Sequence, residues 1–282
     1  MPADPRNAVV VSRQSLHRQL AIFRVAYKQG EVPDFEPGQF ANLGLEAPPP
    51  PEADPEASSA VPTNGEPPKT RPRKGPKLVR RAYSIASPPG EKDAIEFYIV
   101  EVDDGRLTPR LFDLQEGDEL YLDPRMKGKF TLQGVPDGQD LVMISTGTGL
   151  APFRSMLHHY RGQNRWRRFV MIHGVRLAED LGYKQELEAI AAEDPSFVYV
   201  PMCTREPEGA AWQGLRGRVP TVLEPQAYRE LVGADLTPDN CHVFLCGNPA
   251  MIDTCEPLLH ERGFVTRNRE HPDGQVHFER YW

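Results

Sequence analysis

The chain has 282 residues, more than one small domain needs and a fit for two domains of ordinary size. Hydrophobic residues make up 39% and charged residues 26%, a globular composition that excludes wholesale disorder. The 40 acidic side chains outnumber the 33 basic ones and give a net charge of −7, which argues against a nucleic-acid-binding protein.

The sequence also argues against a membrane protein or a secreted one. No apolar stretch approaches the ~18 residues that cross a bilayer. The first residues, MPADPRNAVVVSRQ, lack the basic-then-apolar pattern of a secretory signal. The four cysteines form no CxxC pair, so we expect neither a metal site nor a disulfide framework, and a reduced cytoplasm is the expected location.

The first half of the chain has the pattern of a β-rich domain. Short apolar runs separated by Gly, Pro and Asp turns predict a small antiparallel barrel over residues 1–135. The runs lie at 8–12, 19–27, 39–45, 81–87, 95–102 and 118–122. One short helix is predicted at Leu107–Leu111, with Thr108 as its N-cap and Pro109 at the first helical position.

A proline-rich segment interrupts this domain at residues 47–76. It holds 10 of the 29 prolines and a single large aliphatic residue, Val61. Such a segment buries too little apolar area to offset the entropy of ordering its backbone, so we predict a disordered surface insertion. The sequence around its end is basic, because seven Lys and Arg residues and no acid occur between residues 67 and 90.

The second half, residues 136–282, alternates apolar strands with helix-length segments. The strands are predicted at 141–146, 168–174, 197–204 and 242–247, and the helices at 151–161, 178–193, 217–232 and 249–262. This alternation predicts βαβ units and a parallel sheet. The boundary between the halves is predicted near Gly134–Gly138.

Two strand-to-helix junctions of this sheet have features of an anion site. The first reads STGTGLAP at 145–152, where glycines permit close approach of a phosphate and Pro152 suits the first helical turn. The second reads CGNPAM at 246–251. Ordinary turn packing explains the first equally well, and a tight turn with a buried thiol explains the second.

Taken in order, the motifs resemble those of one family. RAYS at 81–84, FYIV at 97–100, GRLTPRL at 105–111, GTGLAPF at 147–153, CGNPAM at 246–251 and the final Tyr281-Trp282 resemble the ferredoxin/flavodoxin–NADP⁺ reductase family. The resemblance is to the bacterial type with an aromatic C-terminal tail, and it spans the chain apart from residues 47–76. It implies an antiparallel β-barrel that holds FAD, followed by a parallel, Rossmann-like α/β domain that holds NADP(H).

The resemblance also assigns residues to the flavin. Arg81 would neutralise the FAD pyrophosphate through its guanidinium fork, Tyr83 would lie against the isoalloxazine ring, and Ser84 would place its hydroxyl near the reactive nitrogen. Further flavin contacts are implied for Ala82, Tyr98, Ile99, Val100, Glu101, Arg106, Leu107, Thr108 and Thr148.

The end of the chain would complete that site. Tyr281 would cover the other face of the flavin and yield to nicotinamide, and Trp282 would lie by the adenine. Glu279 would place the nicotinamide or supply a proton, with a solvated carboxylate as the alternative. Cys246 would lie near the nicotinamide ring, with a buried structural thiol as the alternative. The catalytic residues are thus predicted to be Ser84, Cys246, Glu279 and Tyr281.

A preference for NADP(H) over NAD(H) is predicted from three arginines. Arg176, Arg205 and Arg218 follow strand-like segments and match positions that hold the adenosine 2′-phosphate in bacterial members of the family. Each arginine alone is equally explained as a surface charge. Val175, Thr204 and Asn248 are expected beside the same nucleotide.

The implied activity is hydride transfer between NADP(H) and flavin, with single electrons passing to or from ferredoxin or flavodoxin. No cluster-binding cysteine set is present, so that acidic carrier would be a separate protein. The basic run from Lys69 to Arg81 would steer the carrier toward the flavin, with a solvated disordered loop as the alternative. Two alternatives stay open. One is the reductase component of an oxygenase system, although the fused ferredoxin domain that such proteins often carry is not expected here. The other is a non-catalytic flavin-binding electron-transfer subunit.

Overall fold

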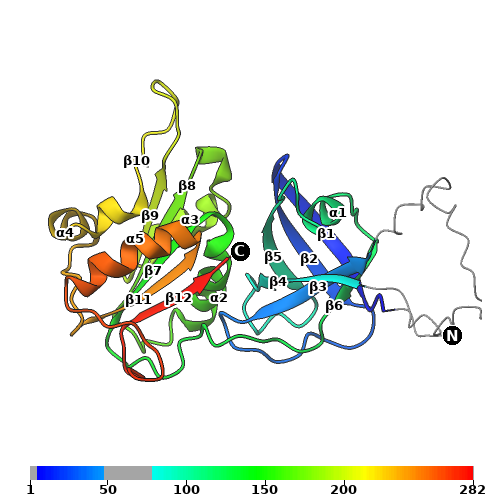
Figure 1. Ribbon diagram of the computed structural model, residues 1–282, viewed down its shortest axis with the longest axis horizontal. Coiled ribbons are helices and arrows are strands. Elements are labelled where there is room, and N and C mark those ends of the chain that lie inside the picture. Colours follow the sequence, from blue (N-terminus) through cyan, green and yellow to red (C-terminus); the bar gives the residue numbers. More distant parts are fainter. Residues whose placement is uncertain (1–4, 48–77, 282) are drawn as a thin grey trace, which may run out of the picture.

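The computed structural model describes residues 5–47 and 78–281. The predicted disordered insertion therefore lies outside the described residues except for Ala47, and so does Trp282. Figure 1 shows the two halves of the chain side by side, with the end of the last strand between them.

The first half is an antiparallel barrel of six strands, as predicted. The elements are β1 (Ala8–His17), β2 (Leu20–Tyr27), β3 (Phe40–Glu46), β4 (Leu78–Ser84), β5 (Ile95–Val100), α1 (Thr108–Phe112) and β6 (Glu119–Leu122). The strands pair in the order β4-β3-β6-β1-β2-β5, and a bridge between Ile85 and Phe97 closes the two edges on each other. The barrel encloses its own apolar core.

The short helix α1 differs from its prediction at one position. Leu107, and not Thr108, is the N-cap. The hydroxyl of Thr108 accepts a hydrogen bond from the amide of Val102 at 3.0 Å and lies 3.2 Å from the carbonyl oxygen of the same residue. Because this hydroxyl ties the helix back to the segment after β5, it is not available for capping.

The second half is a parallel sheet with helices on both faces, again as predicted. Its elements are β7 (Asp140–Thr146), η2 (Gly147–Leu150), α2 (Ala151–Tyr160), β8 (Arg168–Val175), η3 (Ala178–Asp180), α3 (Lys184–Glu193), β9 (Phe197–Cys203), β10 (Leu215–Arg216), η4 (Val219–Leu223), α4 (Pro225–Val232), β11 (Cys241–Gly247), α5 (Pro249–His260) and β12 (Val276–Arg280). The strand order is β10-β9-β8-β7-β11-β12. The central strands β7 and β11 are buried almost throughout, as strands covered on both faces must be.

Two predicted helices are divided in the structure. The segment predicted at 178–193 has a break before α3, because Tyr183 adopts a left-handed conformation with φ 62°. The segment predicted at 217–232 begins as the 3-10 turn η4 and restarts at Pro225, where the extended Glu224 ends the turn and the proline occupies the first helical position.

The two halves share a hydrophobic core. Leu20, Ile22 and Tyr98 of the barrel pack in one cluster with the faces of α2 and α3 and with one face of the parallel sheet. Helices α4 and α5 cover the other face of that sheet in a separate cluster. Val135 also belongs to the shared cluster, so the boundary predicted near Gly134–Gly138 stays a prediction.

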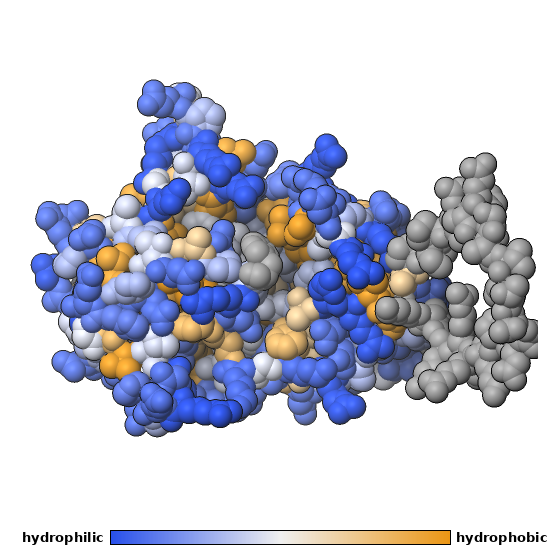
Figure 2. Space-filling view, viewed as in Figure 1, coloured by the Kyte–Doolittle hydropathy of each residue, from blue (hydrophilic) through white to orange (hydrophobic). Residues whose placement is uncertain are grey.

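The surface around this junction is mostly hydrophilic. Figure 2 shows polar residues over much of both halves, with apolar residues gathered beside the junction. Within residues 5–47 and 78–281, no helix is both long enough and apolar enough to cross a bilayer.

Candidate functional site

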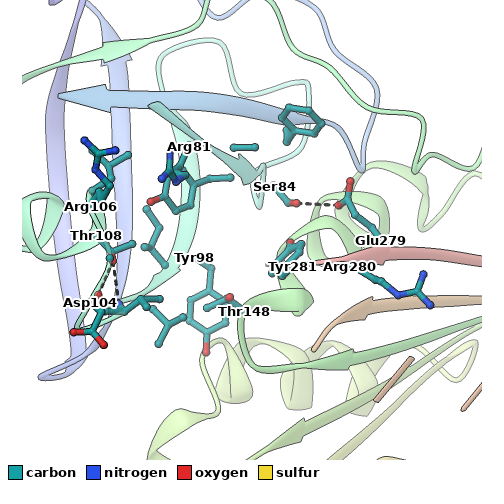
Figure 3. A pocket seen from close by; sticks show the side chains of 18 residues that line it. Arg81, Ser84, Tyr98, Asp104, Arg106, Thr108, Thr148, Glu279, Arg280 and Tyr281 are labelled. Atoms are coloured by element: carbon teal, nitrogen blue, oxygen red, sulfur yellow. Dashed lines mark hydrogen bonds between the residues drawn. The ribbon is translucent and has the colours of Figure 1, made fainter. Parts of the chain in front are cut away.

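A cleft of about 620 Å³ lies between the barrel and the parallel sheet. Many of the predicted flavin residues line it: Arg81, Ala82, Tyr83, Ser84, Tyr98, Ile99, Val100, Arg106, Leu107, Thr108, Thr148, Glu279 and Tyr281. Figure 3 shows Arg81 and Arg106 on one side of the cleft and Ser84, Glu279 and Tyr281 on the other. The walls between these groups are mainly apolar, so the cleft suits a long ligand with a planar apolar end and an anionic end.

The anionic end of such a ligand would meet two exposed guanidiniums. Arg81 lies within β4, paired with Leu43 of β3, and Arg106 lies just before α1. Gly105 directly precedes Arg106, and a Cβ atom there would come within 2.6 Å of the Thr108 hydroxyl and 2.7 Å of the Val102 carbonyl oxygen. Only glycine fits there without displacing its neighbours, so the segment before α1 packs closely and holds Arg106 at the cleft.

The hydroxyl of Tyr83 is a buried polar atom without a partner. It has no hydrogen bond to any residue in the described part of the chain. Burial raises the pKa of this phenol, so it stays neutral and can donate or accept a hydrogen bond. Buried polar atoms are almost always paired, and a ligand with ribityl, phosphate or ring acceptors would satisfy this one. The residues of the cleft thus fit FAD.

The four residues predicted to be catalytic come together at the other end of the cleft. The Ser84 hydroxyl donates a hydrogen bond to Oε2 of Glu279 at 3.2 Å. The phenol of Tyr281 interacts with both Ser84 and Cys246. Cys246 and Glu279 face each other in the pairing of β11 with β12, which explains why residues far apart in sequence meet here.

Burial controls the charge state of this cluster. It raises the pKa of the Glu279 carboxyl, and the hydrogen bond from Ser84 lowers that pKa in part. It also raises the pKa of the fully buried Cys246 thiol well above its usual range, so the sulfur is a neutral thiol at physiological pH. Cys246 is therefore placed beside the cluster as a compact neutral group and not as a thiolate nucleophile.

The residues predicted to hold the nucleotide phosphate gather at a different place, the carboxyl edge of the parallel sheet. The amide and the hydroxyl of Thr204 both donate to the Val175 carbonyl, at 3.0 and 3.1 Å, and the amide of Arg205 donates to the carbonyl of Arg176 at 2.9 Å. Arg218 follows β10, which pairs with β9. All three guanidiniums are exposed, and none forms an ion pair within the described ranges.

The two glycines in the turn after β7 have different surroundings. A Cβ atom at Gly149 would come within 2.3 Å of the Cys246 carbonyl, so Gly149 lets the two predicted junctions touch. Gly147, with φ 53°, faces open space and is free for a ligand. The packing interpretation is confirmed at Gly149, and the anion-site interpretation of this segment stays a prediction.

Two predicted residues lie away from the cleft wall. Asn248 begins α5, where its side-chain oxygen accepts the amide of Ala250 at 2.8 Å. Glu101 follows β5 and donates its amide to the carbonyl of Gln19 at 2.8 Å. Their predicted cofactor contacts stay predictions.

The cleft also contains residues that the motifs did not indicate: Phe40, Val102, Asp104 and Arg280. Those at 102 and 104 lie just before the predicted helix, so their neighbourhood was visible in the sequence. Phe40 lies at the cleft because the pairing of β3 with β4 places it opposite Ser84. A local sequence motif does not predict strand register, so the motifs could not indicate this residue.

A closed antiparallel barrel with this cleft, joined to a parallel sheet with exposed arginines at its carboxyl edge, defines the class: oxidoreductases built from a flavin-binding barrel and a pyridine-nucleotide-binding sheet. Residues 143–256 match the family described as the oxidoreductase NAD-binding domain. A flavodoxin/ferredoxin–NADP reductase of Buchnera aphidicola is 31% identical over 207 residues, which are 73% of this chain and 79% of that protein.

Longer matches agree. The protein of the same name from Escherichia coli is 30% identical over 262 residues, 93% of each chain. The crystal structure of a ferredoxin NADP⁺ reductase from Neisseria gonorrhoeae, with bound FAD and NADP, superposes with a TM-score of 0.79 at 27% identity and covers 98% of each chain. The chain belongs to the flavodoxin/ferredoxin–NADP reductase family, as the motifs predicted.

Proposed function

We propose that this protein transfers a hydride between NADP(H) and FAD and exchanges single electrons with a separate ferredoxin or flavodoxin. The observation that carries this proposal is the cleft in which Arg81 and Ser84 of the barrel meet Glu279 and Tyr281 of the parallel sheet. The relatives named above support the same activity.

Bound FAD supplies the electron chemistry, because it accepts two electrons at once and releases them one at a time. The chain supplies binding and alignment. Arg81 and Arg106 offer positive charge to the pyrophosphate, and the unpartnered Tyr83 hydroxyl offers a hydrogen bond. The ring of Tyr281 lies within the cleft, where it excludes water until the nicotinamide displaces it.

Ser84 and Glu279 manage a proton at the reacting end of the cleft. The raised pKa of Glu279 lets its carboxyl hold a proton at a pH where an exposed glutamate is ionised. Its hydrogen bond with Ser84 fixes the orientation of both groups. This pair can therefore donate a hydrogen bond, or a proton, to a group bound beside Ser84.

The nucleotide is proposed to be NADP(H) and not NAD(H). A 2′-phosphate is a dianion that calls for fork-like donors, and Arg176, Arg205 and Arg218 supply three exposed guanidiniums at one sheet edge. Because the described ion pairs leave all three free, no carboxylate has to be displaced when the phosphate binds.

The electron carrier is proposed to be acidic, since it must approach the rim of the cleft at Arg80 and Arg81, which are both exposed. The rest of the predicted basic run, Lys69 to Lys77, lies outside the described residues. A cytoplasmic location is proposed with it, from the four unpaired cysteines.

An anaerobic titration tests the proposal. The purified protein is mixed with NADPH and, separately, with NADH while the flavin absorbance is followed. We expect NADPH to bleach the flavin rapidly and NADH to do so poorly. Absence of flavin, or a flavin that neither nucleotide reduces, would refute the proposed enzyme.

A second candidate is the reductase component of an oxygenase system. An Amycolatopsis cytochrome P450 reductase superposes with a TM-score of 0.67 at 25% identity, and the match covers 98% of this chain and 69% of that one. Equal reduction by NADH and NADPH in the titration would favour this candidate, because the arginine argument for NADP(H) would then have failed.

A further inference from the structure

The side chain of Tyr98 faces two ways. Its ring lines the cleft from β5, yet its hydroxyl leaves the cleft: in Figure 3 the hydroxyl points away from Arg81 and Ser84. The hydroxyl donates to the carbonyl of Asp180 at 2.9 Å and accepts the amide of Gly182 at 3.0 Å. Both partners belong to the nucleotide half, so one buried side chain joins the wall of the flavin cleft to the other half of the molecule.

The segment from Asp180 to Tyr183 is shaped around this contact. A Cβ atom at Gly182 would come within 2.5 Å of Cζ of Tyr98, so only glycine permits the approach. Tyr183 adopts its left-handed conformation and places its ring edge against Tyr98, with centroids 5.3 Å apart. Its hydroxyl then donates to Glu96 on β5 at 2.9 Å. A strained residue and a required glycine at neighbouring positions both serve contact with the same strand.

The same segment leads to the edge where the arginines gather. The Asp180 carboxylate accepts the amide of Leu177 at 2.9 Å, and Leu177 directly follows Arg176 at the end of β8. Asp180 also meets His17 of the barrel, with 2.9 Å between Nε2 and Oδ1. A short, hydrogen-bonded path thus runs from the cleft wall to the nucleotide edge.

We propose that Tyr98 is a positioning residue whose hydroxyl fixes the nucleotide half against the flavin cleft and so sets the alignment of the nicotinamide over the flavin. The inference rests on the proposed function. Hydride transfer is sensitive to placement, since a misplacement of about 1 Å costs about 100-fold in rate. The shared apolar core alone is non-directional, whereas the two hydrogen bonds to the Asp180 carbonyl and the Gly182 amide define one register.

Two variants test this role. Tyr98→Phe keeps the ring in the cleft and removes both hydrogen bonds, whereas Gly182→Ala keeps the hydroxyl and inserts a methyl group against it. Gly90→Ala is the matched control, because a Cβ atom there meets nothing within 4 Å. In anaerobic rapid mixing with NADPH, we expect flavin reduction to slow on the order of 10-fold for Tyr98→Phe and about 100-fold for Gly182→Ala, and to be unchanged for Gly90→Ala.

A second reaction separates alignment from general damage. Reoxidation of the photoreduced flavin by ferricyanide needs no nicotinamide, so we expect it to be unchanged in all three variants, together with the Kd for FAD. Slowing of both reactions in parallel would overturn the positioning role.

Amide hydrogen exchange supplies a readout that does not involve the bound cofactor. In the apoprotein we expect Tyr98→Phe to speed exchange at the amide of Gly182, which loses the Tyr98 hydroxyl as acceptor and keeps only the Asp180 carbonyl at 3.0 Å, while amides within β7 keep their protection. Unchanged exchange at Gly182, or NADPH reduction at the wild-type rate in both variants, would overturn the inference alone. A wild-type flavin that NADPH fails to reduce would overturn the proposed function, and the positioning role with it.

Discussion

Glu279 accepts a hydrogen bond from Ser84 in the cleft, and its environment predicts how the reaction depends on pH. Burial raises the pKa of its carboxyl, and the Ser84 hydroxyl opposes that rise by stabilising the ionised form. The Glu279 carboxyl therefore loses its proton at a higher pH than an exposed glutamate does.

Two substitutions check this assignment through the pH profile of flavin reduction by NADPH. Glu279→Gln is expected to slow reduction on the order of 100-fold and to abolish the titration. Ser84→Ala is expected to move the titration to higher pH, because the hydrogen bond that lowers the pKa is gone. A titration that persists in Glu279→Gln would assign it to another group.

The three arginines at the sheet edge make a prediction about nucleotide choice. Arg205→Gln removes one charge that would face the 2′-phosphate, so we expect KM for NADPH to rise about 10-fold and KM for NADH to stay unchanged. Arg229 lies on α4 and forms an exposed ion pair with Asp235, so Arg229→Gln is the matched control and should change neither KM. An equal rise for both nucleotides would show that Arg205 does not read the 2′-phosphate.

At the scale of elements, α2 and α3 are tied to the barrel by Arg154. Its guanidinium meets Glu96 of β5 at 3.0 Å and Glu186 of α3 at 2.9 Å, and its side chain is 12% exposed. Arg154→Met would leave two carboxylates in a partly buried site, which costs about 3 kcal/mol in the free energy of unfolding at pH 7. The exposed pair of Arg229 gives a control, since Arg229→Met should cost under about 1 kcal/mol.

Urea unfolding at several pH values shows how the stabilisation by the Arg154–Glu186 ion pair depends on pH. Burial raises the pKa of Glu186, but the hydrogen bond from His158 and the Arg154 guanidinium outweigh it, so its pKa in the folded protein is lowered. Its contribution is therefore present above the pKa of the unfolded state and is lost as the pH falls through the folded pKa. The difference in the free energy of unfolding between wild type and Arg154→Met should become smaller in acid. A difference that grows in acid would contradict the ion-pair explanation.

The elements also show how far the sequence could be interpreted. Hydrophobic patterning predicted the six barrel strands and the four main parallel strands within a few residues, since the barrel strands fill one core and the parallel strands are buried on both faces. It missed β12, because residues 276–280 combine a buried start with an exposed end and were interpreted as a tail. It also missed the break before α3, where Tyr183 adopts a non-helical conformation and its hydroxyl donates a hydrogen bond to Glu96.

The same limit applies to the site. The family resemblance implied that Ser84, Cys246, Glu279 and Tyr281 would share one site, and the structure brings them together, with β11 and β12 pairing Cys246 with Glu279. The second contact of Tyr98, through its hydroxyl, could not be predicted, because it depends on how the two halves pack and leaves no local pattern.

At the scale of the whole molecule, three buried histidines predict instability in acid. Burial lowers the pKa of His173 and of His242 to about 4, and that of His277 to about 3, where His242 and Arg267 add to the effect. The unfolded chain therefore binds more protons than the folded one below pH ~6.5. Stability should fall as the pH drops from ~6.5 toward 4, by up to about 1.4 kcal/mol per pH unit for each histidine.

Urea midpoints measured from pH 7 to pH 5 check this expectation. His277→Phe should flatten the dependence, because it removes one such group, whereas His271→Phe replaces an exposed side chain and should leave the slope as it is. Midpoints independent of pH over this range would contradict the burial of neutral histidines.

The core shared by Leu20, Ile22 and Tyr98 with α2 and α3 also bears on recombination between relatives. A chimera that takes its barrel from one member and its parallel sheet from another would carry two intact folds and an interface that neither parent selected. We expect such hybrids to bind both cofactors and to transfer hydride between them slowly. Successful exchange needs the crossover to carry residues 17–22, 96–98 and 177–183 from a single parent, although they lie far apart along the chain.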